Sequence, residues 1–437
     1  MCGIVAYIGN KQAYDIVIKG LKRLEYRGYD SAGVALLNGD MRVYKKQGKV
    51  SNLEEEALGQ DTTGTIGMGH TRWATHGEPN DKNSHPHLSE SGDLAIIHNG
   101  IIENYATLKE GMIQRGHTFH SDTDTEVLAH LIEDVMVNTG LPLADAVRSA
   151  LKQVVGAYAI VILSKNHPEH LIAARKGSPL VVGLGHDRGE FLFASDATPI
   201  IEYTNKVIYL KDGEVAKVQN KELIIKSIEN VVQVPYVQEL ELSLERLEKG
   251  GYPHFMLKEI YEQPRSIFDS FRGRFDSNTG QIHMRSMEDY AERLKEIKRL
   301  ILIGCGTSWH AGLVAEYLFE DLARVPVEVE YASEFRYRNP VLYADDLVVA
   351  ISQSGETADS LAAMDLAKRK GASVFGVCNV VGSSIPRLSD AGAYTHAGPE
   401  IGVASTKAFT AQVTVLALMA VGMAKLRGTM NMVAIKS

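Results

Sequence analysis

The feature that most limits the fold is a change in the strand and helix pattern about halfway along the 437-residue chain. Up to about residue 238, short apolar, β-prone segments are broken by turns, and helical patterns separate only some of them. From residue 299 onward, apolar strands end in Gly/Ser loops and most are followed by a helix. The first pattern predicts stacked, largely antiparallel sheets with outer helices, and the second predicts a doubly wound parallel sheet.

The individual elements follow from the same patterns. In the first half, strands are predicted at residues 3–8, 34–37, 64–70, 94–98, 158–163, 171–174, 191–194 and 207–210, and helices at 13–24 and 124–138, with Asp124 as an N-cap. In the second half, strands are predicted at 300–304, 327–331, 347–352 and 374–377. Helices are predicted at 256–263, 287–297, 357–370 and 411–426, and a further helix follows the strand 300–304 and ends at Leu318. The charged stretch 239–251 is predicted to be a short helix or linker between domains.

Composition excludes several classes of protein. The net charge of −8 gives no electrostatic footprint for nucleic acid. We see no signal peptide, and the apolar stretch 413–424 is shorter than a membrane span. Three widely spaced cysteines do not form a disulfide framework, which favours a reducing cytoplasm. His85-Pro86-His87 has no further partners at ligand spacing, so we expect no metal and no other cofactor.

Cys2 is the most informative single residue. If Met1 is removed, Cys2 carries a thiol and a free α-amine, whose pKa of about 7.7–8.0 lets it act as a base at neutral pH. A nucleophile with its own base is the N-terminal-nucleophile arrangement. The alternative is a small apolar residue that starts a buried strand.

Polar clusters at predicted strand ends suit amide chemistry on an amino acid. Asn99 and Gly100 can donate a side-chain amide and a backbone N–H to an oxyanion. Arg72 offers a bidentate fork to a carboxylate, and Asp124 offers charge to an ammonium. Taken singly, Asn99-Gly100 is more typical of a type I′ turn, Asp124 of a helix N-cap and Arg72 of a surface ion pair.

Together these segments resemble an N-terminal-nucleophile glutaminase domain. The resemblance rests on residues 1–5, 23–33, 70–78, 98–104 and 123–126, and the Tyr-Arg-Gly-Tyr-Asp-Ser form of residues 26–31 is similar to that of the glutamine–fructose-6-phosphate aminotransferase (isomerizing) family. It implies a four-layer αββα fold over residues 1–240, with Cys2 as nucleophile and Asn99 and Gly100 as the oxyanion hole. It also implies a glutamine site lined by Arg72, Thr75, His76, Gly77 and Asp124, Trp73 as a gate for ammonia, and Arg27 on the loop of Cys2.

Two Gly/Ser loops mark the second half. Residues 304–308 and 352–357 each follow an apolar strand and open a helix, which places backbone N–H groups and hydroxyls where α/β sheets bind phosphates. Plain turn chemistry is the alternative for either loop alone. The first loop is not a dinucleotide fingerprint because position 309 is Trp, and Cys305 and Cys378 are expected to be packing residues.

These loops, with residues 334–338 and 400–407, resemble the first sugar isomerase (SIS) domain of the same family. The resemblance implies that fructose 6-phosphate is held by Thr307, Ser308, Ser352, Gln353, Ser354 and Thr357, with Val403 and Ser405 against the sugar. It does not make Lys407 a Schiff-base lysine. We therefore expect a linker and helical segment at 241–290 and a SIS domain at 291–437.

Family members carry a second SIS domain that supplies the residues for sugar isomerisation, and we expect that domain to be absent from this chain. The expected function is transfer of the glutamine amide nitrogen to fructose 6-phosphate, giving glucosamine 6-phosphate and glutamate. This chain alone is expected to keep glutaminase activity and partial sugar-phosphate binding. Expected partners are glutamine, fructose 6-phosphate and a second copy in a homodimer. A separate chain carrying the missing domain is a further candidate partner. Alternatives are a non-catalytic sugar-phosphate-binding regulator or another glutaminase-coupled amidotransferase.

Overall fold

The computed structural model describes residues 2–25, 28–74, 76–240, 249–276 and 279–431. The chain divides into two compact units, Met1–Leu244 (the N-terminal unit) and Glu245–Ser437 (the C-terminal unit). Most of the predicted linker at 239–251 falls on residues 241–248, outside the described residues.

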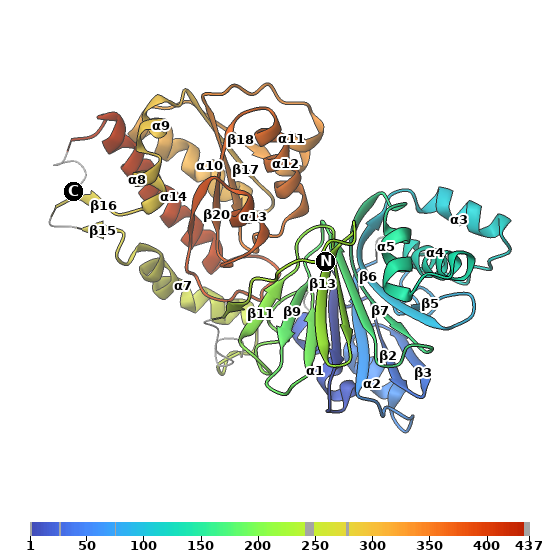
Figure 1. The fold of residues 1–437 in the computed structure, drawn as a ribbon. Coiled ribbons are helices and arrows are strands. Elements are labelled where there is room, and N and C mark those ends of the chain that lie inside the picture. The colour runs from blue at the N-terminus through green and yellow to red at the C-terminus, as the bar shows by residue number, and fades with distance from the viewer. Residues whose placement is uncertain (1, 26–27, 75, 241–248, 277–278, 432–437) are drawn as a thin grey trace. The chain divides into compact units, whose positions relative to one another are not determined.

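The N-terminal unit contains two antiparallel sheets (Figure 1). The eight-stranded sheet has the order β14-β11-β9-β10-β1-β4-β2-β3, with bounds β1 (Gly3–Ile8), β2 (Ser31–Asn38), β3 (Asp40–Gln47), β4 (Ile66–Arg72), β9 (Val181–Leu184), β10 (Phe191–Ala194), β11 (Lys206–Tyr209) and β14 (Gln238–Glu239). The six-stranded sheet has the order β13-β12-β8-β7-β6-β5, with bounds β5 (His87–Leu88), β6 (Leu94–Ile102), β7 (Gly156–Ser164), β8 (Leu171–Lys176), β12 (Glu214–Gln219) and β13 (Glu222–Ser227).

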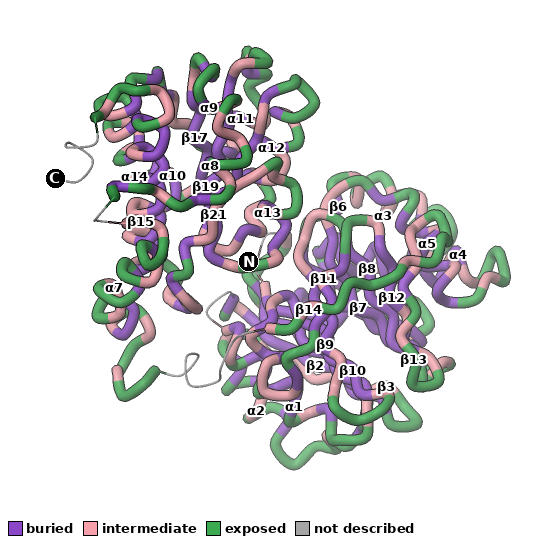
Figure 2. Tube along the Cα trace, turned by 60° about the vertical axis from the view of Figure 1, so that its left-hand side comes forward, coloured by how far each residue is buried: buried purple, intermediate pink, exposed green. Residues whose placement is uncertain are grey.

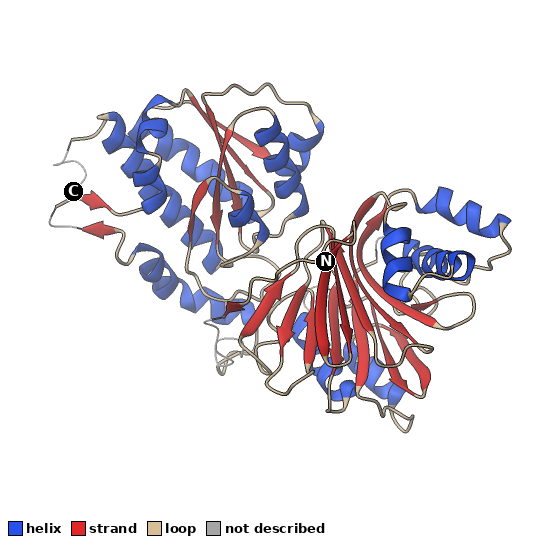
Figure 3. Cartoon of the chain, viewed as in Figure 1, coloured by secondary structure: helices blue, strands red, loops and turns tan. Residues whose placement is uncertain are grey.

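The two sheets stack face to face, and alternating side chains from both fill the layer between them. Ile4 and Met68 of one sheet share this core with Ile97 and Val161 of the other. Helices α1 (Ala13–Leu24) and α2 (Val50–Ala57) pack on the outer face of the larger sheet. Helices α3 (Tyr105–Gln114), α4 (Asp124–Thr139) and α5 (Leu143–Leu151) lie on the outer side of the smaller sheet (Figure 3). The predicted αββα arrangement is therefore confirmed.

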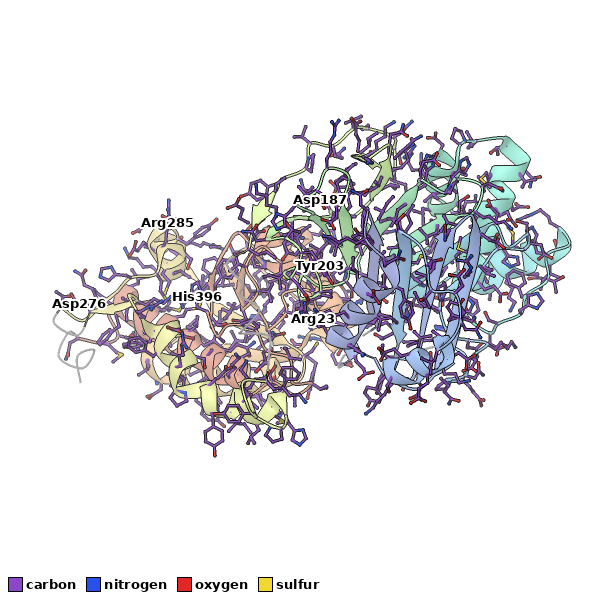
Figure 4. All side chains as sticks on the ribbon, turned by 90° about the horizontal axis from the view of Figure 1, so that it is seen from below. Arg23, Asp187, Tyr203, Asp276, Arg285 and His396 are labelled. Carbon is purple, nitrogen blue, oxygen red and sulfur yellow. The ribbon has the colours of Figure 1, made fainter. Side chains whose placement is uncertain are left out.

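Two local features of this unit refine the predictions. Helix α4 begins at Asp124, but its N-cap is Thr123, whose side chain accepts a hydrogen bond from the backbone N–H of Glu126. The predicted N-cap at Asp124 is thus wrong by one residue. A second local feature lies on α1, beside the larger sheet. Arg23, near the end of this helix, forms an ion pair with Glu202 at 2.5 Å, next to Tyr203 (Figure 4).

The C-terminal unit is a doubly wound parallel sheet, as predicted. Its strands β17 (Arg299–Gly304), β18 (Val327–Tyr331), β19 (Asp346–Ser352), β20 (Ser373–Cys378) and β21 (Ala391–Tyr394) have the order β18-β17-β19-β20-β21. The three central strands, β17, β19 and β20, are buried on both faces (Figure 2). The edge strands β18 and β21 are mostly half-buried. Strand β18 lies on one side of β17, and β19, the next strand in the sequence, lies on the other side. The direction of winding therefore reverses between β17 and β19. Ligands bind at such a switch point in open α/β sheets.

Helices cover both faces of this sheet. One face carries α9 (Ala291–Glu296), α10 (Thr307–Leu318), the π-helical turn η2 (Phe319–Ala323) and α14 (Lys407–Arg427), and the other carries α11 (Ala332–Tyr337), α12 (Ala358–Arg369) and α13 (Ser384–Leu388). Helix α7 (Phe255–Phe271) packs on α14, and a small hairpin, β15 (Phe275–Asp276) and β16 (Gln281–Ile282), leads to α8 (Arg285–Asp289). The single helix predicted over 287–297 is therefore two short helices, which meet at Tyr290.

Helix α14 is longer than the sequence pattern indicated. It spans 21 residues, so the apolar stretch 413–424 is only its middle, and by length and composition it could cross a membrane. More than half of its apolar window, 56%, is buried inside the structure, as in the core helix of a water-soluble domain. Val415, Leu416 and Met419 pack in the same core as Leu302 and Phe319. The apolar sides of α14 are therefore largely occupied within this unit.

Candidate active site

Cys2 lies just before β1, against the residue that follows β4. The backbone N–H of Trp73 donates to Cys2 Sγ at 3.2 Å, and Sγ lies 3.5 Å from the carbonyl oxygen of the same residue. Protein atoms crowd the sulfur, and this desolvation raises the pKa of the thiol, while the Trp73 hydrogen bond and the charge of Arg72 oppose the rise. The thiol is therefore protonated at neutral pH and needs a base to become a nucleophile.

Small residues allow the backbone around Cys2 to close tightly. A Cβ on Gly3 would lie 2.6 Å from Thr71 Oγ1 and 2.7 Å from Leu24 Cβ, so only glycine fits beside the nucleophile. A Cβ on Gly28 would lie 2.8 Å from the carbonyl carbon of Arg72. The close contact at Gly3 holds the residue after Cys2 against α1 and β4, and the close contact at Gly28 holds its loop against the end of β4.

Asp30 holds the segment that carries Trp73. Its backbone N–H donates to the carbonyl of Arg72 at 3.0 Å, and its Oδ2 accepts from the N–H of Ala74 at 2.9 Å. The ring of Trp73, which is 44% exposed, stands edge-on to Tyr29 with centroids 5.3 Å apart. Sequence reasoning gave Asp30 no role, although it lies inside the segment 23–33 that carried the resemblance.

Asn99 reaches Cys2 from the other sheet. Its Nδ2 donates to the Cys2 carbonyl at 3.0 Å, and its Oδ1 lies 2.8 Å from His70 Nε2. Burial lowers the pKa of His70 to about 3, so the ring is neutral and its Nε2–H donates to the Asn99 oxygen. This bond sets the amide orientation, and the second N–H of Nδ2 stays available for an oxyanion. His70 is a positioning residue that the sequence did not single out.

Asn99 and Gly100 lie inside strand β6, not in a turn. They pair with Ala159 and Tyr158 of β7. Gly100 has φ 136°, and a Cβ there would lie 2.0 Å from the Ala157 carbonyl oxygen. The type I′ turn considered for this dipeptide is therefore wrong, and the glycine is required by the close approach of β7.

Arg72 is buried at the end of β4 and binds the loop that follows it. Its guanidinium donates to the carbonyl oxygens of His76, of Gly77 at 3.2 Å and of Glu78 at 3.4 Å. Burial lowers its pKa, while the nearby charges of Cys2 and Asp124 oppose the change. The side chain is thus no surface ion pair, and it fixes the loop predicted to line the glutamine site.

His76 and Gly77 occupy that loop. The His76 ring stands edge-on to Tyr105 of α3 with centroids 5.3 Å apart. Gly77 has φ 76°, and a Cβ there would lie 2.7 Å from Asn83 Nδ2. Thr75 and Arg27, which were also predicted for this site, lie outside the described residues.

Asp124 is 5% exposed and binds the end of β6. Its Oδ2 accepts from the N–H of Ile102 at 2.8 Å and lies 4.0 Å from His98 Nδ1. His98 Nδ1 also lies 2.9 Å from Thr125 Oγ1. Asp124 is thus a buried acid that links α4 to the strand carrying Asn99.

In the C-terminal unit, the first Gly/Ser loop joins β17 to α10 at the switch point. Gly306 has φ 58° and is the N-cap residue of α10, so Thr307 and Ser308 form the first turn of a 12-residue helix. The Ser308 hydroxyl accepts from Gln412 Nε2 of α14 at 3.0 Å. The other side-chain atom, Gln412 Oε1, is buried and has no hydrogen-bond partner among the described residues.

The second loop joins β19 to α12 beside it. The Ser352 hydroxyl accepts from the N–H of Gly355 at 3.0 Å and lies 3.1 Å from Thr357 Oγ1. The Ser354 hydroxyl accepts from the N–H of Glu356 at 3.2 Å, and the Gln353 carbonyl accepts from the N–H of Asn379 at 3.3 Å. Gly355 has φ 66°, as this tight loop requires.

Val403 and Ser405 lie on the segment between β21 and α14. Val403 is 82% exposed, and Ser405 is partly buried. Glu259 of α7 holds this segment, because its carboxylate accepts from the N–H groups of Ile401 at 2.6 Å and Gly402 at 3.0 Å. No residue of this segment was linked to α7 by sequence pattern.

Three remaining residues of the second half behave as non-nucleophilic groups. Burial raises the pKa of both Cys305 and Cys378. Lys407 is buried and its ammonium lies 2.6 Å from Glu262, so it is held in an ion pair. These placements agree with the expectation that none of the three is a reactive group.

Comparison with known proteins gives two domain families. A glutamine amidotransferase domain matches residues 54–238, and a SIS domain matches residues 293–422. Among solved structures, the C-terminal domain of glucosamine-fructose-6-phosphate aminotransferase from Francisella tularensis is 42% identical, covers 43% of this chain and 52% of its own, and has a TM-score of 0.41. The glutamine phosphoribosylpyrophosphate amidotransferase of B. subtilis is 18% identical over 91% of each chain, with a TM-score of 0.46.

Two curated relatives cover almost the whole chain. The glutamine–fructose-6-phosphate aminotransferase (isomerizing) of Bacteroides thetaiotaomicron is 59% identical over 434 residues, which are 99% of this chain and 70% of the relative. The protein of the same name from Chlorobaculum tepidum is 58% identical over 97% of this chain and 70% of its own length. The chain therefore belongs to the glutamine–fructose-6-phosphate aminotransferase (isomerizing) family of enzymes.

Proposed function

We propose that the N-terminal unit hydrolyses the side-chain amide of glutamine with Cys2 as the nucleophile. The observation that carries the proposal is the convergence on Cys2 of the Trp73 N–H at 3.2 Å and of an Asn99 amide whose orientation is fixed by His70. A partly buried nucleophile with oriented donors beside it is an arrangement that suits acyl transfer from an amide.

The base in this proposal is the α-amine of Cys2 itself, after removal of Met1. The raised pKa of the thiol means that it does not ionise unaided at neutral pH. An α-amine of pKa about 7.7–8.0 is neutral often enough to accept the thiol proton, directly or through a water. The thiolate then attacks the amide carbon of glutamine.

The tetrahedral intermediate places negative charge on the former carbonyl oxygen. We assign its stabilisation to the free N–H of Asn99 Nδ2 and to the backbone N–H of Gly100. The leaving nitrogen takes a proton from the α-ammonium and departs as ammonia, which leaves a γ-glutamyl thioester on Cys2. Water, deprotonated by the same amine, hydrolyses the thioester to glutamate and restores the thiol.

Arg72, Thr75, His76, Gly77 and Asp124 complete the proposed glutamine site, with Arg72 toward the α-carboxylate and Asp124 toward the ammonium. Support comes from the guanidinium of Arg72, because the charges of Cys2 and Asp124 both act on it and oppose the lowering of its pKa. In the same proposal, Trp73 controls the escape of ammonia, and Arg27, outside the described residues, keeps its predicted role on the loop of Cys2.

For the C-terminal unit, we propose that the two loops at the β17/β19 switch point bind fructose 6-phosphate. The hydroxyls and helix N-termini of both loops suit a phosphate dianion. The proposed ligands are Thr307, Ser308, Ser352, Gln353, Ser354 and Thr357, with Val403 and Ser405 against the sugar. The unpartnered buried Gln412 Oε1 beside Ser308 is an acceptor that a sugar hydroxyl can satisfy.

The complete proposed reaction transfers ammonia from glutamine to fructose 6-phosphate and gives glucosamine 6-phosphate and glutamate. Both partners are small metabolites, so we propose a cytoplasmic enzyme, and we propose a homodimer as its assembly. The proposal includes no cofactor.

The test measures the two half-functions separately on the 437-residue chain. Intact-mass spectrometry first establishes loss of Met1, and glutamate release is then measured with and without fructose 6-phosphate. We expect glutamate release that Cys2→Ala abolishes, and calorimetric binding of fructose 6-phosphate that Cys2→Ala leaves unchanged. Sugar-phosphate binding with no glutamate release from the Met-processed protein would contradict the glutaminase and favour a sugar-phosphate-binding regulator.

A variant with one alanine inserted between Met1 and Cys2 isolates the role of the amine. It keeps the thiol but moves the α-amine to another residue. We expect it to bind glutamine and to release glutamate at least about 100-fold more slowly, since general-base catalysis contributes about 10²–10⁴-fold. Undiminished turnover would show that a different group is the base.

A further inference from the structure

We infer that the N-terminal unit carries a divalent metal site formed by Glu90, His117 and His130, and that zinc is the metal it suits best. The three residues come from the loop between β5 and β6, the loop between α3 and α4, and α4 itself. None of them belongs to the proposed glutamine site, so this inference goes beyond the proposed function.

One atom of each side chain points to a common centre. The two Nδ1 atoms of His117 and His130 lie 3.0 Å apart, and Glu90 Oε2 lies 3.5 Å from the Nδ1 of His130 and 4.0 Å from that of His117. Ligands about 2.0–2.1 Å from a tetrahedral zinc are separated by roughly 3.3 Å. The observed triangle therefore needs only small side-chain adjustments to coordinate the ion.

The far side of each ring faces a carboxylate. His117 Nε2 lies 3.4 Å from Asp134 Oδ1, and His130 Nε2 lies 3.9 Å from Glu126 Oε1. A carboxylate hydrogen-bonded to a histidine, as Asp134 is to His117, keeps the proton on that nitrogen and leaves the other nitrogen free to bind a metal. The separation of 3.9 Å between His130 and Glu126 is beyond hydrogen-bond distance, so Glu126 acts on that ring through its charge alone. Two Nδ1 lone pairs only 3.0 Å apart repel each other, so a proton or a cation must lie between them.

Those two carboxylates are themselves held in place. Glu126 accepts from the N–H groups of His120 at 2.8 Å and Ser121 at 2.6 Å. Asp134 lies 3.2 Å from Arg115 Nε through its Oδ2 and accepts from Asn138 Nδ2 at 3.0 Å through its Oδ1. The outer shell is therefore built before any ion arrives, as in protein metal sites.

The surroundings favour a cation over a shared proton. His130 is 1% exposed and stacks on Phe119 with centroids 4.5 Å apart. Glu90 is 41% exposed at its side chain, which gives the ion an entry path and leaves a fourth position for water. Two imidazoles and one carboxylate form a donor set that suits zinc better than calcium or magnesium, which prefer oxygen ligands. The ion would tie the loop before Asp124 to α4 and to the β5–β6 loop.

The test is zinc binding by the full chain after chelator treatment and dialysis. We expect one zinc ion per chain by elemental analysis, displaced by a competing chromogenic chelator, and a rise in melting temperature on adding zinc. His117→Gln and Glu90→Gln should each weaken binding at least 10-fold and remove the rise. The exposed histidine of the same loop supplies the matched control, because His120→Gln should change neither.

Thiol binding is the competing source of zinc affinity, since Cys2 and Cys305 are partly exposed. Cobalt substitution separates the two, because a thiolate ligand gives an intense sulfur-to-cobalt charge-transfer band and the His/Glu site gives none. Equal zinc affinity in the wild type, His117→Gln and Glu90→Gln, or a charge-transfer band from the bound cobalt, would overturn the inference. Absence of zinc binding by the folded wild type would overturn it too, and would assign a shared proton to the His117–His130 pair.

Discussion

His70 Nε2 lies 2.8 Å from Asn99 Oδ1, and this contact crosses from the eight-stranded sheet to the six-stranded one. It decides which end of the Asn99 amide faces Cys2. We expect Asn99→Ala to lower kcat for glutamine hydrolysis by about 10²–10³-fold, the usual effect of losing one oxyanion donor. Steady-state glutaminase kinetics on the Met-processed chain measure this directly.

The same contact predicts a smaller, separable effect for His70 itself. His70→Leu removes the donor that orients Asn99, and we expect kcat to fall by about 5–100-fold because one buried hydrogen bond is lost. KM should change little, since His70 does not face the proposed substrate. His70→Gln keeps a side-chain N–H and should recover part of kcat. A change confined to KM would contradict the positioning role.

The pH dependence of glutamate release distinguishes two ways of activating Cys2. Burial raises the thiol pKa above its ordinary value of 9.0, so a thiol that ionised unaided would give a rate still rising above pH 9. With the α-amine as base, kcat/KM should rise to about pH 8 and then level off, because the amine is neutral above its own pKa. Glutamate release measured in stopped assays from pH 6 to 10, at those pH values where the enzyme stays folded, separates the two outcomes.

The backbone conformation of Gly100 predicts a large stability effect. Gly100→Ala places a methyl group 2.0 Å from the Ala157 carbonyl oxygen at φ 136°, and we expect a loss of about 2–5 kcal/mol. Gly92→Ala is the matched control, because Gly92 also has positive φ but no neighbour within 4 Å. It should cost about 1 kcal/mol.

The two tryptophans allow this effect to be measured in one unit. Trp73 lies in the N-terminal unit and Trp309 in the C-terminal unit, so in a Trp309→Phe background the fluorescence reports on the N-terminal unit alone. Urea titration of both glycine variants in that background gives the comparison. Equal losses for Gly100→Ala and Gly92→Ala would show that β7 does not approach β6 as described.

Buried histidines predict an early onset of acid destabilisation. Burial lowers the pKa of His70 to about 3 and holds those of His85 and His87 well below the ordinary value. Below pH 6.5 the unfolded chain binds protons on these rings and the folded chain does not, so the unfolding free energy falls as pH falls. Each ring contributes up to about 1.4 kcal/mol per pH unit.

The slope between pH 6.5 and 5.0 is the quantity to measure, by urea unfolding at several pH values. His85→Leu should reduce that slope by the contribution of one histidine, up to about 1.4 kcal/mol per pH unit. This reduction is expected whatever the substitution does to the free energy of unfolding at pH 7.5. His186→Gln, at an exposed position, should leave the slope unchanged. Identical slopes in all three proteins would mean that His85 is not buried in its neutral form.

In the C-terminal unit, Ser352 connects loop geometry to ligand binding. Ser352→Ala removes the acceptor for the Gly355 N–H and the contact with Thr357, so we expect about 10-fold weaker binding of fructose 6-phosphate. Ser373→Ala, at the opposite end of the neighbouring strand, should leave the affinity unchanged. Isothermal titration calorimetry compares the two variants, and equal affinities would remove the switch-point loops from the binding site.

Features of the fold that depend on local sequence pattern, such as strands and the order of the layers, could be predicted from the sequence. The catalytic candidates Cys2 and Asn99, the strands beside them and the layer order could all be read from periodicity and from family resemblance. Contacts between sheets could not, because stacking brings together residues with no fixed spacing. The contact of His70 with Asn99 is of this kind. The cluster of Glu90, His117 and His130 was missed for a related reason, since two loops and a helix bring together residues with no fixed spacing.

Helix ends were predicted less well, for identifiable reasons. The helix predicted to stop at Gln263, just before Pro264, continues to Phe271 with the proline inside it. Tertiary packing of α7 on α14 compensates for the hydrogen bond that proline cannot make. Helix α14 begins at Lys407, four residues before the predicted start at 411, and its first turn is tied to α7 by the ion pair between Lys407 and Glu262.

Strand β1 pairs with β4 on one side and with β10 on the other, so the strand beside Cys2 is completed by residues 191–194. During synthesis at about 5–20 residues per second, roughly 10–40 s separate the emergence of these two strands from the ribosome. Over that interval β1 lacks one of its two neighbours in the sheet. We therefore expect removal of Met1, which the proposed mechanism requires, to occur before the larger sheet is complete.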